Sequence, residues 1–328
     1  MLNKQQTANE PIPLATAESL DLSFVIPAMN EEATIRTLRN LLHEAVTRLG
    51  QTYEIIFIDD GSTDQTLTEM EQLRKEYPQI RVIAFRRNFG KAAALDAGFR
   101  RARGKVIFTM DADLQDDPKE ISRFLQKLET GYDVVSGWKQ KRHDPLGKTL
   151  PSKLFNYVVR KFTHIELNDF NCGFKAYRRE ATENLTLYGD LHRFVPVLVH
   201  GNGFRVGEIS VEHHARQHGE SKYGWERFTR GFFDLLTVIV ATRFSTRPLH
   251  FFGTVGLGLG AVGFSLLLYL SALWLMGESI GQRPLLLLGI LLLIFGVQLV
   301  STGLVGELVI RGHRETKPNY VIRSDHSS

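Results

Sequence analysis

Two long segments near the C-terminus contain no charged residue. They span residues 251–276 and 284–306, and each exceeds the roughly 20 apolar residues that a helix needs to cross the hydrocarbon core of a bilayer. Because a backbone in that core must satisfy its hydrogen bonds internally, each segment is predicted to be a transmembrane helix. The alternative is a buried hairpin in a soluble core, which apolar segments of this length rarely form.

Basic residues flank this pair of segments on the outside. Arg243 and Arg247 come before it, and Arg311, Arg314 and Lys317 follow it, whereas the connecting loop, GESIGQR, is short and nearly neutral. The positive-inside rule therefore places both ends of the chain in the cytoplasm. We expect a two-helix transmembrane hairpin over residues 248–312 and a basic cytoplasmic tail over residues 313–328.

The stretch that precedes the first span mixes basic residues with apolar ones. Residues 224–244 contain Arg227, Arg230 and Arg243 among aromatic and aliphatic side chains. A basic amphipathic stretch is typical of a helix that lies in the headgroup region, so we expect such a helix over residues 226–247. An ordinary core helix of the preceding domain remains the alternative.

The N-terminus and the cysteine content exclude several classes of protein. Residues 1–20 lack the apolar core of a signal peptide and are predicted to form a flexible tail. A single cysteine, Cys172, excludes an intrachain disulfide and a cysteine-rich metal site. The net charge of +4 suits nucleic acid, an anionic membrane or a phosphorylated substrate, and by itself it selects none of them.

Between residues 22 and 138, short β-rich runs alternate with helical stretches such as residues 31–49 and 90–102. Near-continuous apolar strands joined by helices favour a parallel sheet that is covered on both faces. Residues 139–216 are less regular, and we interpret them as the second half of the same domain, which is expected to span residues 21–225. The β-rich runs are residues 22–28, 53–61, 80–88, 105–113 and 132–138, with a further strand-like segment at 204–216.

Polar residues gather where three of these strands end. In open α/β sheets, ligands bind beyond the carboxyl ends of the strands, so these residues should converge on one rim. They are Asn30, Glu31 and Glu32 after the first strand, Asp59 and Asp60 after the second, and Asp111 and Asp113 after the fourth.

Asp111 and Asp113 form a D-x-D pair of hard oxygen ligands that suits Mg²⁺ or Mn²⁺. Such a pair is weak evidence alone, since one occurs by chance about once in a chain of this size. Its position strengthens the metal interpretation, because two carboxylates at the end of a buried strand repel each other. This repulsion must be balanced by a cation or by another favourable interaction. Asp116 and Asp117, just before Pro118, are instead expected to begin the next helix.

A glycine pattern in the first apolar segment matches a dinucleotide-binding motif. Gly258-x-Gly260-x-x-Gly263 has the G-x-G-x-x-G spacing, but it lies inside a predicted span and follows no strand. Together with Gly256, these glycines are expected to let the two transmembrane helices pack closely.

Five motifs, in this order and at these separations, resemble the family-2 glycosyltransferases with the GT-A fold: VIPAMNEE, FIDDGSTDQT, RRNFGKAAALDAGF, DADLQDDP and CGFKAYRRE. The chain is most similar to the polyisoprenyl-phosphate glycosyltransferases, which include dolichol-phosphate mannose synthases and bacterial undecaprenyl-phosphate glucosyltransferases. The resemblance covers nearly the whole chain, including RQHGESKYG, RPLHFFG and the paired spans. It implies an α/β catalytic domain of the GT-A type, Rossmann-like with a mostly parallel sheet.

The resemblance also implies roles for individual residues. Asp111 and Asp113, with Gln115 completing the shell, would coordinate Mg²⁺ or Mn²⁺ at the diphosphate of the donor. Arg216 and Lys222 would hold phosphates of the donor or of the lipid acceptor, although a solvated or lipid-facing basic loop is the alternative. The nucleotide-sugar itself would be bound by Pro27, Asn30, Glu31, Asp59, Asp60, Lys91, Asp111 and Gln115.

The CGFK segment departs from the family pattern. The glucosyltransferase-like members carry Gly-Asp-Phe-Arg there, with the aspartate proposed as a base, whereas this chain has Gly173 at that position. Asp169 is the nearest substitute. A phosphate monoester is largely a dianion at neutral pH, so a base is dispensable and orientation of the acceptor by Arg or Lys matters more.

The resemblance implies an inverting, metal-dependent enzyme of the bacterial inner membrane, with its catalytic domain and both termini in the cytoplasm. It would move a hexose from a UDP-sugar to undecaprenyl phosphate, and the expected hexose is glucose. Use of GDP-mannose, a processive polysaccharide synthase and a non-catalytic sugar-nucleotide binding protein remain alternatives. Against the synthase, there is no Q-x-x-R-W motif and there are too few spans for a translocation channel. A homo-oligomer is compatible with the small residues in the spans, and nucleic acid is not expected as a partner.

Overall fold

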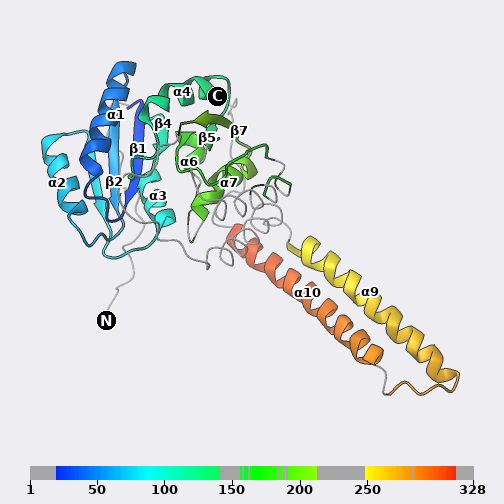
Figure 1. Cartoon of the computed structure of the whole chain (residues 1–328). Coiled ribbons are helices and arrows are strands. Elements are labelled where there is room, and N and C mark those ends of the chain that lie inside the picture. The colour runs from blue at the N-terminus through cyan, green and yellow to red at the C-terminus, as the bar shows by residue number, and fades with distance from the viewer. Residues whose placement is uncertain are drawn as a thin grey trace, which may run out of the picture.

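The computed structural model describes residues 20–140, 165–183, 191–212, 248–281 and 284–314, together with single residues between 156 and 189. These residues form an α/β domain and a helical hairpin that projects from it (Figure 1). Arg216, Lys222, the expected amphipathic stretch, the N-terminal tail before residue 20 and nearly all of the basic tail lie outside the described residues. The domain limits expected from the sequence therefore stay predictions.

The domain is built on a seven-stranded mixed sheet in the order β3-β2-β1-β4-β6-β5-β7. All neighbouring strands run parallel except β6, which lies antiparallel between β4 and β5. The mostly parallel sheet and its expected strands are confirmed, whereas β6 was not expected. The strands are β1 (Leu22–Ala28), β2 (Tyr53–Asp59), β3 (Ile80–Ala84), β4 (Val106–Thr109), β5 (Val134–Lys139), β6 (Lys175–Arg178) and β7 (Val206–Val211).

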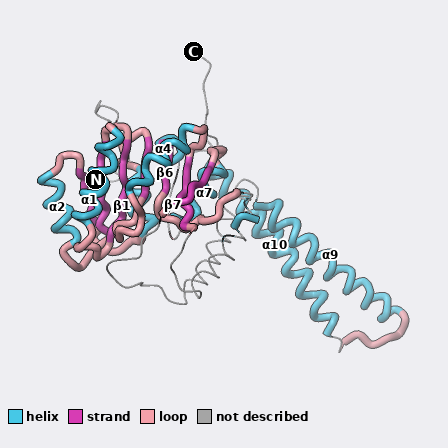
Figure 2. Tube along the Cα trace, turned by 45° about the horizontal axis from the view of Figure 1, so that its top comes forward, coloured by secondary structure: helices cyan, strands magenta, loops and turns pink. Residues whose placement is uncertain are grey.

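Helices cover both faces of the sheet (Figure 2). Because side chains alternate along a strand, Phe24 packs into one apolar cluster with Leu38 of α1, and its neighbour Val25 packs into the other with Leu95 of α3. The unbroken apolar strands predicted from the sequence are explained by these two cores. The helices are α1 (Ile35–Leu49), α2 (Thr66–Glu76), α3 (Lys91–Phe99), η1 (Pro118–Glu120), α4 (Ile121–Glu129), α6 (Arg179–Glu183), η2 (Leu191–Phe194) and α7 (Val195–Gly201).

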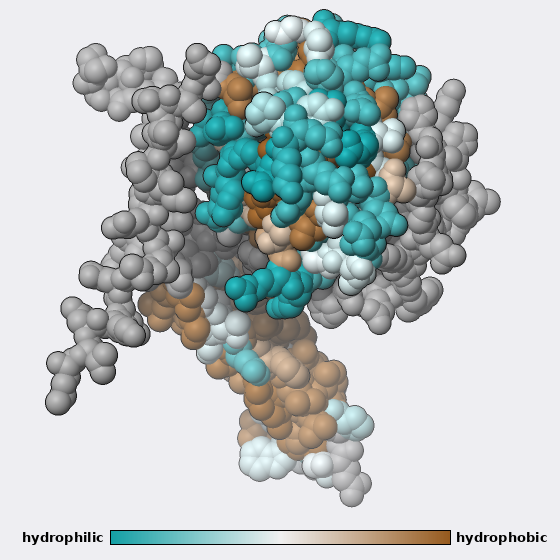
Figure 3. Space-filling model, turned by 90° about the vertical axis from the view of Figure 1, so that its left-hand side faces the viewer, coloured by the Kyte–Doolittle hydropathy of each residue, from teal (hydrophilic) through white to brown (hydrophobic). Residues whose placement is uncertain are grey.

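The hairpin consists of α9 (Pro248–Leu275) and α10 (Pro284–Arg314), which lie side by side along their length (Figure 1). Both are long and apolar enough to cross a membrane by length and composition. All but two of the exposed large apolar side chains in the described residues belong to this hairpin, and its surface is brown over most of its length in Figure 3, where the visible face of the domain is largely teal. Apolar exposure on this scale is typical of a surface that contacts lipid or another protein.

Glycines set the close packing of α9 against α10. A Cβ atom on Gly256 would lie 2.6 Å from the carbonyl oxygen of Gly296, and one on Gly263 would lie 2.7 Å from that of Gly289, whereas one on Gly258 would meet nothing. The prediction that these four glycines let the helices pack closely is therefore confirmed for Gly256 and Gly263, whereas Gly258 and Gly260 both have room for a Cβ atom. No nucleotide motif is involved, because these residues sit in the middle of a long helix.

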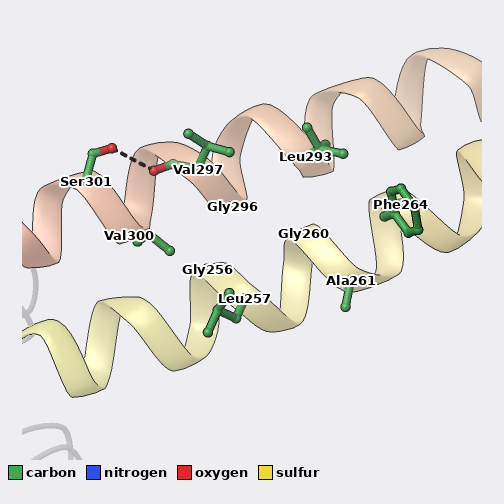
Figure 4. Close-up of a pocket in the computed structure, with 10 residues that line it drawn as sticks. All are labelled: Gly256, Leu257, Gly260, Ala261, Phe264, Leu293, Gly296, Val297, Val300 and Ser301. Carbon is green, nitrogen blue, oxygen red and sulfur yellow. Dashed lines mark hydrogen bonds between the residues drawn. The ribbon is translucent and has the colours of Figure 1, made fainter.

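A shallow groove of about 490 Å³ runs between the two helices at this point (Figure 4). Its lining includes Leu257, Phe264 and Leu293, and its one hydroxyl, on Ser301, donates to the carbonyl oxygen of Val297 at 3.0 Å. No charged side chain lines the groove. The groove therefore offers a binding surface for an apolar group and no charged group for catalysis.

Candidate active site

The ends of β1 and β2 are joined by a network of hydrogen bonds. Ala28 and Asp59 are register partners at the carboxyl ends of the two strands. The Asn30 side-chain oxygen accepts from the Thr63 backbone N–H at 2.8 Å, and the Asn30 N–H donates to the Ser62 hydroxyl at 3.0 Å. The rim expected from the sequence thus holds Asn30 and Asp59 close together.

Asp60 extends this network to the loop that follows β3. Its carboxylate accepts from the backbone N–H groups of Phe89, at 2.7 Å, and Gly90, at 3.0 Å. Burial raises the pKa of Asp60, and the nearby Asp59 raises it further, while the two N–H donors oppose the shift. The carboxylate therefore fixes the start of α3, whose first residue is Lys91.

Two non-glycine residues in the described part of the chain have a positive φ, Asn30 at 58° and Leu114 at 60°. Asparagine tolerates this conformation, but a bulky residue such as leucine rarely adopts it. Strained backbone of this kind persists where surrounding contacts determine it, often at functional sites. Here the two residues follow β1 and β4, and Leu114 directly follows Asp113.

Asp111 and Asp113 occupy the turn after β4. Asp111 is about one-third exposed, at 34%, and pairs with Lys91. Asp113 is buried, and its Oδ1 accepts from the Gln115 N–H at 3.2 Å. Burial alone would raise the pKa of Asp111, but the positive charges of Lys91 and Lys139 outweigh it and hold the pKa below the usual range. Asp111 is therefore an ionised carboxylate at neutral pH.

Asp116 belongs to this charged cluster, which corrects the prediction that it only begins a helix. Asp117 is the N-cap of η1 and accepts from the Lys119 N–H at 2.9 Å, as expected. Asp116 instead is buried and forms an ion pair of 3.2 Å with Lys139, at the end of β5. Burial raises the pKa of Asp116 despite the attraction of Lys139. Sequence reasoning missed Lys139, although a lysine at the carboxyl end of an apolar strand was the available signal.

The antiparallel strand β6 brings the CGFK segment beside the acidic turn. Its first residue, Lys175, is the register partner of Thr109, the last residue of β4, and the Thr109 hydroxyl donates to the Gly173 carbonyl oxygen at 2.8 Å. A Cβ atom on Gly173 would lie between 2.6 and 3.0 Å from the carboxylate atoms of Asp111. A side chain at residue 173 would therefore displace Asp111. The observed position of the Asp111 carboxylate thus requires the glycine that this chain has in place of the family's aspartate.

Asp169, the residue predicted as a substitute base, is buried. Its Oδ1 accepts from the Asn171 N–H at 3.0 Å, a contact that stabilises the local turn. Its role as a base stays a prediction.

Two further residues, which sequence reasoning also missed, complete the surroundings of the site: Lys175, which is buried, and His192, which is partly buried. The Lys175 ammonium donates to the Cys172 carbonyl oxygen, and burial lowers the pKa of this lysine. Burial, together with the positive charges of Lys91 and Arg193, lowers the pKa of His192 to about 2, so this imidazole is neutral. No pattern in the sequence distinguished either residue.

The residues present suit a divalent cation that is shared with a substrate. Within the described ranges, no group of three or more His, Cys, Asp or Glu side chains is placed to hold a metal alone. Mg²⁺, however, is commonly bound by one or two carboxylates together with substrate phosphates and water. Asp111 and Asp113 supply two carboxylates, and Gly173 leaves the Asp111 carboxylate without a covering side chain on that side. This donor set fits a metal–diphosphate complex.

Comparisons with known proteins agree on one family. A profile of the family described as Glycosyl transferase family 2 matches residues 23–186. The chain is 40% identical over 328 residues to a dodecaprenyl-phosphate galacturonate synthase of Rhizobium johnstonii, covering 97% of each chain. It is 36% identical over 300 residues to an undecaprenyl-phosphate 4-deoxy-4-formamido-L-arabinose transferase of Pseudomonas paraeruginosa, covering 90% of this chain and 87% of the relative.

A solved structure shares the fold of the domain. It is glucosyl-3-phosphoglycerate synthase from Mycobacterium tuberculosis in complex with Mn²⁺, uridine diphosphate and phosphoglyceric acid, with a TM-score of 0.52 and 19% identity over 68% of this chain and 78% of that chain. At this identity the likeness establishes the fold alone. The fold is thus the GT-A type expected from the sequence.

Proposed function

The chain belongs to glycosyl transferase family 2, and on this premise we propose that it is a membrane-bound enzyme that transfers a sugar from a nucleotide-sugar to a polyprenyl phosphate. The named relatives each act on a polyprenyl phosphate, and the hairpin supplies two candidate membrane spans. The observation that carries the proposal is the position of Asp111 and Asp113 at the rim of the sheet, beside Lys91 and against the bare backbone of Gly173.

In this proposal the rim of the sheet binds the donor. We assign binding of the base and ribose to Asn30 and the Asp59/Asp60 pair, together with Pro27 and Glu31, and binding of the diphosphate to Lys91. Asp111 and Asp113, with Gln115, would hold Mg²⁺ or Mn²⁺. When bound, the cation neutralises the negative charge that develops on the departing nucleoside diphosphate.

The acceptor requires no strong base in this site. Its phosphate is largely a dianion at neutral pH, so an acceptor oxygen attacks the anomeric carbon while the bond to the diphosphate breaks, and a single displacement inverts the configuration. We assign orientation of the acceptor phosphate to Arg216 and Lys222 and keep Asp169 as the candidate base. A variant Asp169→Asn that retains turnover would show that no base is needed from this residue.

The identity of the sugar is a separate part of the proposal. The resemblance seen in the sequence favours glucose from a UDP-sugar, whereas the named relatives transfer galacturonate and 4-deoxy-4-formamido-L-arabinose. We therefore propose a UDP-linked sugar as the donor class and include all three sugars, with GDP-mannose, in the test.

The test uses membranes that contain the full chain, undecaprenyl phosphate and each radiolabelled nucleotide-sugar in turn. We expect one donor to give a lipid-linked monosaccharide whose formation stops on chelation of divalent cations and resumes with Mg²⁺ or Mn²⁺. Growing polymer would favour a processive synthase. Absence of any lipid product from every donor would favour a non-catalytic sugar-nucleotide binding protein and would overturn the proposal.

We further propose that the enzyme lies in the bacterial inner membrane with its catalytic domain and both termini in the cytoplasm. The support is the excess of basic residues on the outer flanks of the hairpin.

A further inference from the structure

The loop between β3 and α3 forms an exposed projection at the rim of the site. Arg86, Arg87, Asn88 and Phe89 are all exposed, and we refer to residues 86–89 as the rim finger. Phe89 is 52% exposed, and within the described residues 20–212 the one other exposed large apolar side chain is Leu41, at 40%. An exposed phenylalanine next to two arginines is an unusual feature of a domain surface that is otherwise largely polar.

The shape of the rim finger is fixed by the residues beneath it. The Phe89 and Gly90 N–H groups donate to the Asp60 carboxylate. A Cβ atom on Gly61 would lie 2.5 Å from the backbone carbon of Arg87, so only glycine permits this close approach. The backbone of the finger is therefore held in place, and the exposure of Phe89 follows from that anchoring.

The side chains of the finger combine an apolar surface with positive charge. The Arg87 guanidinium carbon lies 4.2 Å from the centroid of the Phe89 ring, within the range of a cation–π contact. Phe85 also contacts Phe89, with the two ring centroids 5.6 Å apart and the ring planes at an angle of 85°. Such pairs, apolar in body and cationic at the tip, suit the boundary between acyl chains and headgroups.

We propose that Arg86, Arg87 and Phe89 form a contact surface for the anionic headgroup layer of the bilayer that α9 and α10 cross. This inference rests on the proposed function in one respect, since a rim that receives a lipid phosphate must lie close to that layer. Charge complementarity supports it, because an anionic leaflet attracts basic side chains near its surface. The finger then holds the rim against the membrane at the place where the acceptor phosphate enters.

The first test measures proximity to lipid and requires no turnover, so its failure is distinct from failure of the proposed function. The native Cys172 is buried, and burial raises its pKa to about 12, so it stays unlabelled. The full-length variants Phe89→Cys and Leu41→Cys each receive an environment-sensitive fluorophore and are placed in phosphatidylglycerol-containing vesicles. We expect a blue shift and quenching by nitroxide-labelled lipid at residue 89 and neither at residue 41.

Equal emission and equal quenching at residues 89 and 41 would overturn the proposal. The same labelled Phe89→Cys protein is also titrated with UDP in detergent without lipid. A change in emission on addition of UDP, without a response to vesicles, would mean that the finger contacts the nucleotide instead and would equally overturn the proposal.

The second test separates lipid contact from donor binding by kinetics. In phosphatidylglycerol vesicles, the Arg86→Gln/Arg87→Gln double variant is expected to raise KM for the polyprenyl phosphate by about fivefold per arginine removed, with kcat and KM for the donor unchanged. In neutral phosphatidylcholine vesicles, the variant and the natural protein should agree.

The control removes the same charge elsewhere. Arg74→Gln/Lys75→Gln, in the exposed last turn of α2, should behave as the natural protein in both kinds of vesicle. A raised KM for the donor in the finger variant, or an equal loss in the α2 control, would contradict the proposal.

Discussion

Asp111 is the residue on which the charged groups of the site converge. It pairs with Lys91, it lies against the backbone of Gly173, and its pKa is held down by Lys91 and Lys139 against the effect of burial. This pairing has a consequence for metal binding. A cation bound at Asp111, as proposed, would take over part of the charge compensation that Lys91 provides.

Removal of one carboxylate from the pair should abolish metal-dependent turnover. Asp113→Asn keeps the shape of the side chain but removes its charge, and we expect kcat to fall roughly a thousandfold. The measurement is the initial rate of lipid product as Mg²⁺ or Mn²⁺ is varied. Asp117→Asn is the matched control, because Asp117 caps η1 and should affect stability only modestly. Unchanged metal dependence in Asp113→Asn would refute the metal assignment.

Gly173 is predicted to tolerate no side chain, including the aspartate that the family motif carries. Gly173→Ala would place a methyl group within 3.0 Å of the Asp111 carboxylate, so we expect about a tenfold or larger loss of apparent metal affinity. Gly173→Asp should lose more, because it also adds a like charge. The readout is the Mn²⁺ concentration that gives half-maximal activity.

Gly207→Ala provides the control for Gly173. Its added methyl group would press on the ring of Tyr132 at 2.7 Å, a packing strain at the opposite end of β5 from Lys139. It should lower the melting temperature without altering the metal dependence. A Gly173→Ala enzyme with the natural metal dependence would contradict the proposed reason for the glycine.

Glu54 lies near the amino-terminal end of β2, at the opposite end of the strand from Asp59. Its ionisation is predicted to make the free energy of unfolding depend on pH. Burial alone would raise the pKa of Glu54, but hydrogen bonds from Arg81, Ser23 and Arg103 outweigh it and lower the pKa below its ordinary value of 4.5. The folded chain therefore binds fewer protons than the unfolded chain in this range. The resulting stabilisation is fully present above about pH 4.5 and is lost as the pH falls through the folded pKa.

Glu54→Gln should remove this dependence. At neutral pH we expect a loss of about 2 kcal/mol, since the arginine partners are partly exposed, and a melting temperature lower by roughly 4–8 °C. Below pH 4.5 the difference from the natural protein should shrink. The measurement is thermal unfolding in detergent as a function of pH, with Glu76→Gln, on an exposed ion pair with Arg36, as the control that should change little.

At the scale of elements, the short strand β6 decides the composition of the site. It contains four residues and lies antiparallel between β4 and β5. Its pairing with β4 places residue 173 beside Asp111, and its pairing with β5 brings Ser136 opposite Lys175. The five strands before it were predictable because each lies in an apolar run. The four residues of β6, in contrast, begin with a lysine and end with an arginine, so they show no such run.

The glycines of the hairpin give a prediction at the same scale. Gly256→Ile would force a branched side chain toward the Gly296 carbonyl oxygen, whereas Gly258→Ile would meet open space in the same helix. Overpacking of this kind costs about 1–3 kcal/mol, so only the first variant should separate α9 from α10. The measurement is the thermal stability of the purified full chain in detergent. Equal stability of the two variants would contradict the observed packing.

At the scale of the whole molecule, the hairpin determines on which side of the membrane the loop between its helices lies. If both termini are cytoplasmic, residues 277–281, between α9 and α10, face the opposite side. Ser279→Cys should therefore react with a membrane-impermeant maleimide added to intact cells, once the outer membrane has been made permeable. The variant Leu41→Cys in the domain should react only after the inner membrane is disrupted. The reverse pattern would invert the proposed topology.

The sequence by itself determined the features that depend on local pattern. Apolar runs predicted β1, β2, β4 and the two long apolar helices α9 and α10, because the residues of a strand or helix themselves indicate whether it avoids water. Carboxylates at strand ends predicted the rim, because parallel strands present their carboxyl ends at one edge. The local pattern also placed Asp117 at the start of a helix, where it caps η1.

Only the tertiary structure decided which residues meet across the site. Asp116 follows Asp113 closely in sequence, yet its partner, Lys139, comes from another strand. Gly173 reaches Asp111 through the unexpected strand β6, and the rim finger is exposed because Asp60 and Gly61 hold its backbone. The physical reason is common to all three. The local sequence pattern indicates whether a residue is buried or exposed, whereas the residues that it contacts depend on packing between segments that are distant in sequence.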